Sequence, residues 1–146
     1  MGRKGQRHGV DFLIRDHAAG QASTLLRRLA FQASRTARNG DAGSVHDLRV
    51  SIRRLAQCLQ VFGQFFPRKS GKKFQHRLNA VMDLASAVRD RDIAMNFLAA
   101  ARIPSDSALV QVLSQERAGA KRSLVAALER WSRRGLHKKW LSRLKL

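Results

Sequence analysis

The strongest constraint on the fold is the segment from Val45 to Phe66, in which apolar residues recur at helical spacing. Residues three and four positions apart stack on one side of an α-helix, because each turn takes about 3.6 residues. The apolar residues share a face spanning about 100° of a helical wheel, namely Val45, Leu48, Ile52, Leu55, Leu59, Phe62 and Phe66. The segment therefore predicts an amphipathic helix. The helix is expected to end at Phe66, because Pro67 disfavours helical geometry in the residue before it.

A turn is predicted directly before this helix, at Asn39–Gly43, where Asn, Gly and Asp cluster. Ser44 stands three residues before Asp47, in a pattern similar to a capping box with Asp in place of the usual Glu or Gln. The helix is thus expected to begin at Ser44, with His46 in its first turn. Unpaired backbone N–H groups there would favour an anion.

Helical periodicity covers most of the remaining chain. Between Val10 and Ala37, one face carries the apolar residues Ile14, Ala18, Ala22, Leu25, Leu29 and Ala33, and four arginines lie off it, Arg27, Arg28, Arg35 and Arg38. After the cationic connector 68–73, another helix is expected to turn inward Phe74, Leu78, Val81, Met82, Ala85 and Val88. A long helix is predicted from Asp106 to Arg134. A terminal helix over 136–146 follows, with Trp140, Leu141 and Leu144 on its apolar side.

The segment Arg89-Asp90-Arg91-Asp92 alternates charge on or near the apolar face of the third helix. Either these residues pair there, or the helix breaks around Asp90. The favoured prediction is a break, with Asp92 capping a short helix, Ile93–Ala101.

The fold class follows from these patterns. The chain has no tyrosine and two prolines, and it has few β-branched runs. Short loops between long amphipathic helices predict an all-α fold, an antiparallel bundle of about four main helices plus a short terminal helix. Residues 1–9, with three glycines and no apolar residue after Met1, are expected to form a flexible basic tail. Residues 10–146 are expected to form one domain.

The net charge indicates an anionic partner. The 146 residues contain 29 Lys and Arg against 10 Asp and Glu, a formal charge of +19. Such a charge repels itself and exceeds what solubility requires. Nucleic acid, an anionic membrane surface and inorganic polyphosphate each supply counter-charge. No apolar stretch is long enough to cross a bilayer, and no apolar segment follows the basic N-terminus, so a cytoplasmic protein without membrane insertion is expected.

A basic stripe lies opposite the apolar face of the 45–66 helix. His46, Arg49 and Arg53 are spaced i, i+3 and i+7, with Arg54 beside them. The stripe is on the order of 10 Å long. A linear polyanion laid along it would meet several donors in succession, and guanidinium groups suit phosphate oxygens. The alternative is a solvated charged face without a ligand.

A second basic group stands at the start of the next helix and includes Lys73, His76 and Arg77. Catalytic, metal and cofactor sites are not predicted. The chain has only two glutamates, Glu116 and Glu129, and no glycine-rich phosphate loop or metal-ligand spacing. Its lone cysteine, Cys58, excludes an intrachain disulfide. The phenylalanines mostly fall on predicted core faces. The exposed aromatic platforms expected of a protein that binds single-stranded nucleic acid are therefore missing.

Two motifs resemble the family of CHAD domains, the conserved-histidine α-helical domains. Val45–Leu55 (VHDLRVSIRRL) is similar to the family's His-Asp-x-Arg-Val…Arg-Arg-Leu signature, and Val88–Ile93 (VRDRDI) to its Arg-Asp-x-Asp-Val segment. The resemblance implies a helical fold whose positively charged groove binds inorganic polyphosphate, often on polyphosphate granules. By motif position it implies ligand contacts for His46, Arg49, Arg53, Arg54 and Arg89. Lys73, His76 and Arg77 join this set from their helix position alone.

Family members commonly contain two similar helical halves about a pseudo-twofold axis, whereas the His46-Asp47-x-Arg49 motif has no second copy here. The resemblance therefore implies a homodimer that rebuilds the two-half architecture. Some relatives are fused to a triphosphatase domain, whose paired-glutamate strands are absent, so no enzymatic activity is implied.

Two alternatives stay open. A nucleic-acid-binding protein would use the same charge to contact the phosphate backbone. A histidine phosphotransfer bundle would use His46 as phosphoacceptor, but a charge of +19 is unusual for a partner of a response regulator.

Overall fold

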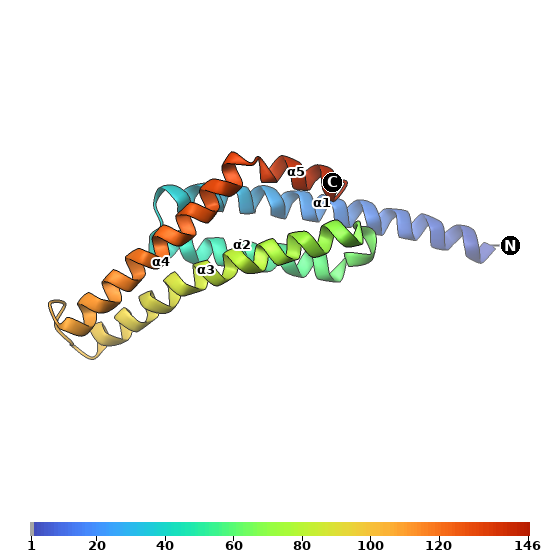
Figure 1. The fold of residues 1–146 in the computed structure, drawn as a ribbon. Helices are drawn as coiled ribbons and strands as arrows, with labels where there is room; N and C mark the ends of the chain where they lie inside the picture. Colours follow the sequence, from blue (N-terminus) through green and yellow to red (C-terminus); the bar gives the residue numbers. More distant parts are fainter. Residues whose placement is uncertain (1) are drawn as a thin grey trace.

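A computed structural model describes residues 2–146, with side chains from Gly5 onward, and shows helices joined by short loops. The α-helices are α1 (Gly2–Arg38), α2 (Ala42–Val61), α3 (Arg68–Ala100), α4 (Ala108–Arg133) and α5 (Leu136–Arg143), and a 3-10 turn, η1 (Gly63–Phe65), links α2 to α3. Consecutive long helices run antiparallel, and α5 continues beyond the end of α4 and lies along α1 (Figure 1). No strand occurs in the described part of the chain, which confirms the all-α bundle.

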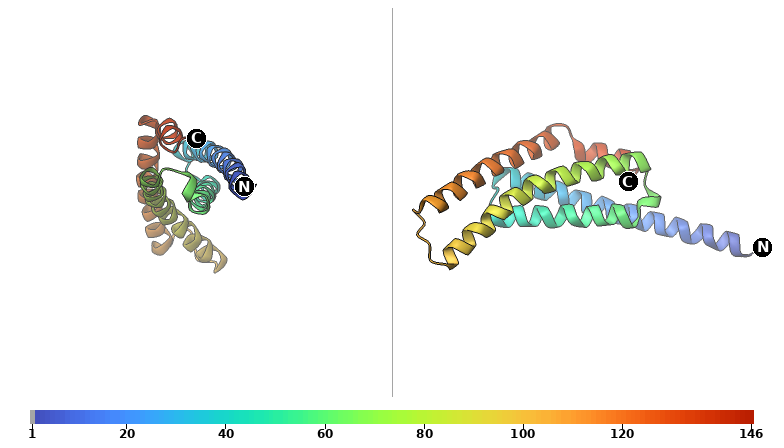
Figure 2. Two further views of the ribbon diagram at one scale, coloured as in Figure 1. Left: turned by 90° about the vertical axis from the view of Figure 1, so that its right-hand side faces the viewer. Right: turned by 60° about the horizontal axis from the view of Figure 1, so that its bottom comes forward.

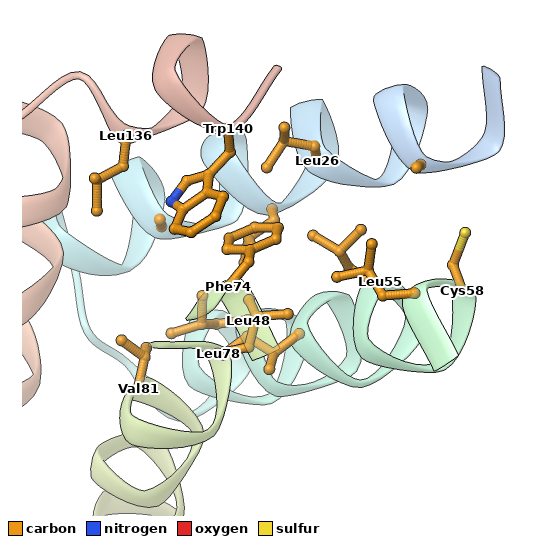
Figure 3. Packing of buried hydrophobic residues seen from close by; sticks show 14 of the residues in the cluster. Leu26, Leu48, Leu55, Cys58, Phe74, Leu78, Val81, Leu136 and Trp140 are labelled. Atoms are coloured by element: carbon orange, nitrogen blue, oxygen red, sulfur yellow. The ribbon is translucent and has the colours of Figure 1, made fainter. Parts of the chain in front are cut away.

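A single apolar core receives side chains from every helix. Phe74 of α3 and Trp140 of α5 lie near its centre, with ring centroids 4.3 Å apart and planes 21° from parallel (Figure 3). The predicted inner face of α2 is confirmed, since its residues are buried apart from the half-buried Phe62. The inner face of α3 is likewise confirmed, with Met82 half-buried, and so is the apolar side of α5.

The start of α1 differs from the prediction. The helix begins at Gly2, so residues 2–9 of the predicted tail continue α1, and Met1 lies outside the described residues. Once packing from Ala18 onward fixes a helix, adding residues needs no new nucleus. Side chains from Gly5 to His17 are exposed, because this part of α1 projects beyond the bundle (Figure 1). Ile14 is therefore exposed, whereas four of the other predicted face residues are buried and Leu25 is half-buried.

The start of α2 also requires a correction. Asp41, not Ser44, caps the helix, because its carboxylate accepts the N–H of Ser44 at 2.7 Å. Gly40 adopts a left-handed conformation that brings Asp41 into this position. His46 consequently lies in the second turn, beyond the unpaired N–H groups. The helix ends at Val61, earlier than Phe66, because Gly63 begins a tighter 3-10 turn.

The predicted break in α3 at Asp90 is wrong, because the helix continues to Ala100. Asp92 is buried and accepts hydrogen bonds from Arg117 of α4, and Arg91 pairs with Glu116 at 3.3 Å. Pairing across α3 and α4 satisfies these charges inside a continuous helix. The long final helix and the terminal helix are confirmed, with α5 three residues shorter than expected.

Replacing Gly40 with alanine is expected to lower the free energy of unfolding by about 1–2 kcal/mol, the cost of a left-handed non-glycine residue. Gly40 has φ +60°, and a Cβ there would lie 2.6 Å from Cε of Lys121. Urea denaturation of Gly40→Ala measures the effect. Gly43→Ala, in the first turn of α2 at an ordinary φ, is the control and should not destabilise. Equal destabilisation by both substitutions would contradict the assignment.

Candidate functional site

The outer face of α2 carries the basic stripe. The inner face of this helix packs into the core, so His46, Arg53 and Arg54 are exposed and Arg49 is half-buried. The structure thus keeps these four candidate residues together. Around the helix, His46 and Arg53 lie close together on the outer face, Arg54 lies on one side of them and Arg49 on the other.

A groove between α1 and α2 forms the first flank. It has a volume of about 440 Å³ and brings Arg27 and Arg28 of α1 beside Arg54 of α2. Asp47 is the acidic lining residue, and its carboxylate accepts a hydrogen bond from Arg35 at 2.8 Å. The charge of Asp47 is therefore balanced by Arg35, and the three arginines give the groove an excess of positive charge.

Sequence reasoning missed Arg27 and Arg28 as site residues. It placed them off the apolar face of their helix, where a solvated arginine is the ordinary outcome. Only the packing of α1 against α2 brings them next to Arg54, which is 26 positions from Arg28 in the sequence. No local pattern could have indicated that contact.

Phe31 corrects a second expectation. It lies in the same groove and is 61% exposed, and Phe12 and Phe97 are exposed as well, so three of the seven phenylalanines lie outside the core. An exposed aromatic ring beside arginines is a feature on which a nucleic-acid base can stack.

The second flank of the stripe faces α3. Arg49 lies roughly 140° around α2 from Arg54, and α2 packs against α3 as well as α1. Its Nε is buried and has no hydrogen-bond partner. Gly71 of α3 lines a groove of about 750 Å³ together with residues of α2 and η1, so its side of α3 faces α2. The half-buried Arg89 is 18 residues, or five helical turns, further along and so lies on the same side of α3 as Gly71. Arg89 therefore lies on the flank of α3 that faces α2.

Lys73 and Arg77 do not join the stripe. The guanidinium of Arg77 lies 5.9 Å from the ring centroid of Trp140, so Arg77 faces α5. Lys73 precedes Arg77 by one turn and shares that flank of α3. His76 is exposed on the outer side of the helix. Lys73 and Arg77 therefore lie on a different flank of α3 from the one that faces the stripe.

The N-terminus of α2 is already occupied by an anion of the chain itself. The hydrogen bond from Ser44 lowers the pKa of Asp41 below its usual value of 3.8. The cap is therefore charged at neutral pH, and its stabilising effect fades as the pH falls through that lowered pKa. A ligand phosphate at His46 would not meet open backbone N–H groups at this helix end.

The described residues include no group of three His, Cys, Asp or Glu side chains that could hold a metal ion. Glu116 is engaged with Arg91. In the same part of the chain, no helix combines the length and the apolar character needed to cross a membrane.

Among comparisons with known proteins, a family model described as CHAD domain matches residues 20–145, from the packed part of α1 to the C-terminal segment. No curated protein matches, and no solved structure matches.

Proposed function

The chain belongs to the CHAD domain family, and on this premise we propose that it binds inorganic polyphosphate along the basic face of α2, without catalysis. The observation that carries the proposal is the arrangement of cations around that face. His46 and Arg53 are exposed on the outer face of α2, Arg54 joins Arg27 and Arg28 in the groove beside α1, and the half-buried Arg49 lies on the opposite flank of α2.

This arrangement suits a linear chain of phosphates. Each phosphate offers oxygens that accept paired hydrogen bonds from a guanidinium group, and arginine remains charged at any working pH. His76, Lys73 and Arg77 extend the positive field but are not part of the proposed contact surface.

Binding to nucleic acid is the second candidate, and Phe31 favours it. Its exposed ring lies in the groove with Arg27 and Arg28, where a base could stack while the arginines contact phosphates. A polyphosphate chain has no base. Phe31→Ala should therefore leave polyphosphate affinity unchanged, and a large loss of nucleic-acid affinity alone would identify a second use of the groove.

We further propose a homodimer in which a second copy supplies the other wall of the groove. The outer part of the α3–α4 hairpin supports this proposal, because residues 93–115 contain one cation, Arg102, and one anion, Asp106. Apolar side chains are exposed there, namely Ile93, Phe97, Ile103, Leu109 and Val112. The hairpin projects beyond the α1–α2 loop (Figure 1, Figure 2). Two copies of a cationic chain can approach through such a neutral surface with the least repulsion.

Light scattering with and without polyphosphate tests the dimer. The native protein is expected to have the mass of two chains, and Phe97→Asp, at a residue that is 72% exposed, is expected to shift it toward one. A monomer under both conditions would rule out the dimer and would leave the proposal of polyphosphate binding unaffected.

Localisation on polyphosphate granules is proposed on the same basis as polyphosphate binding.

A titration of fluorescently labelled long-chain polyphosphate at about 0.15 M salt, where the Debye length is about 8 Å, tests the function. Saturable binding that weakens as salt rises is expected, because bound phosphates exchange counterions for arginines. Failure to bind at this salt concentration would overturn the proposal.

A further inference from the structure

A cavity bounded by α1, α4 and α5 has a volume of about 600 Å³. It lies on a different side of α1 from the basic groove, which is formed with α2. Its walls consist largely of apolar side chains such as Leu29, Ala33 and Leu128. Small-molecule sites typically have volumes of about 300–1,000 Å³ and mostly apolar linings with a few placed polar groups. The cavity therefore has the size and lining of such a site.

Polar atoms without partners lie beside this cavity. Among the described residues, the buried side-chain nitrogens and oxygens without a hydrogen bond are Arg49 Nε, His137 Nε2 and Trp140 Nε1. His137 lines the cavity, and Trp140, only 1% exposed, follows it by three positions on the same side of α5. The indole nitrogen lies on the side of Leu136, another lining residue (Figure 3). Because an indole N–H can only donate, this end of the cavity lacks an acceptor.

Positive charge borders the same cavity. Arg38 at the end of α1 and Lys138 beside His137 are both lining residues with exposed side chains. Glu129 is the acidic residue of the lining. Two cations against one anion give the border of the cavity a net positive charge, while its walls are apolar. This combination suits a molecule with one anionic end and an apolar remainder.

We propose that this cavity binds an amphipathic carboxylate, whose apolar tail packs against the leucine and alanine walls. The carboxylate has two acceptor oxygens and no donor, which matches the unpartnered indole N–H of Trp140, and His137 Nε2 can donate to it in the tautomer that carries the proton there. Its charge is balanced by Arg38 and Lys138. Polyphosphate does not suit this site, because it has no apolar part to cover the walls. The site is independent of the proposed polyphosphate surface.

Dodecanoate, kept below its micelle-forming concentration, is the probe, and tryptophan fluorescence is the readout. Trp131 lines the cavity and Trp140 lies beside it, and these are the two tryptophans of the chain. A saturable change in emission is expected. Arg38→Glu/Lys138→Glu should weaken dodecanoate binding at least tenfold. Arg134→Glu/Lys139→Glu, a change of equal charge at exposed neighbours outside the lining, should alter it less than twofold.

A variant that fills the cavity separates this site from the basic groove. Ala33→Phe should abolish dodecanoate binding and leave polyphosphate binding intact, with far-UV circular dichroism reporting that the helices persist. Three results would each overturn the proposal. These are no saturable signal in the native protein, equal affinity for dodecanoate and dodecyltrimethylammonium, and displacement of dodecanoate by polyphosphate.

Discussion

Asp92→Asn is expected to lower the free energy of unfolding by about 3 kcal/mol, because it breaks a buried ion pair. Asp92 and Arg117 join α3 to α4, with side chains only 9% and 19% exposed. Arg117 also donates to the carbonyl of Gly40 at 3.1 Å, so the pair fastens the α1–α2 loop to the hairpin. Removing the carboxylate's charge leaves a buried guanidinium without its counter-charge. Urea denaturation measures the loss.

A second ion pair between the same helices serves as the control. Arg91 and Glu116 are 36% and 46% exposed, and solvent screens their attraction. Glu116→Gln is therefore expected to cost less than about 1 kcal/mol. The double variant Asp92→Leu/Arg117→Met should be more stable than Asp92→Asn, because it removes both charges together. Equal effects of Asp92→Asn and Glu116→Gln would show that burial does not distinguish the two pairs.

Reversing two charges on the stripe is expected to produce the largest effect on binding. Arg49→Glu/Arg53→Glu should weaken polyphosphate affinity at least a hundredfold, about 2.7 kcal/mol. Each substitution removes a charge-assisted contact to phosphate and adds repulsion in its place. The affinity for labelled polyphosphate, measured by anisotropy, provides the value.

Arg122→Glu/Arg130→Glu is the matched control for this reversal. Both residues are exposed on α4, which packs against α1 and α3, and the net charge changes by the same amount. A loss of only a few-fold is expected, because these positions contribute to the general field and not to the surface on α2. Equal losses from the two double variants would mean that the charge acts diffusely, without a defined site.

The sequence predicts best what depends on local spacing. The inner faces of α2 and α5 follow from apolar residues three and four positions apart, and burial confirms them. The basic stripe lies on the side of α2 opposite its core face. The sequence alone therefore predicts that His46, Arg53 and Arg54 face solvent. Periodicity alone suffices for such predictions.

Contacts between helices explain what the sequence could not show. Asp92 looks like a cap when only its own segment is considered, and its partner Arg117 stands 25 positions away. Arg28 joins Arg54 for a similar reason. The cap at Asp41 was missed on different grounds, since Asp and Ser are about equally good caps and both occur near the turn. The left-handed Gly40 decides between them.

The most direct test of the central proposal is competition between ligands at about 0.15 M salt. Labelled long-chain polyphosphate is bound first and then challenged with DNA or RNA at a matched phosphate concentration. Polyphosphate should remain bound, because closely spaced phosphates engage the arginines around α2 more densely than a nucleic-acid backbone does. Displacement by nucleic acid at equal phosphate concentration would contradict the account and show a general polyanion-binding protein.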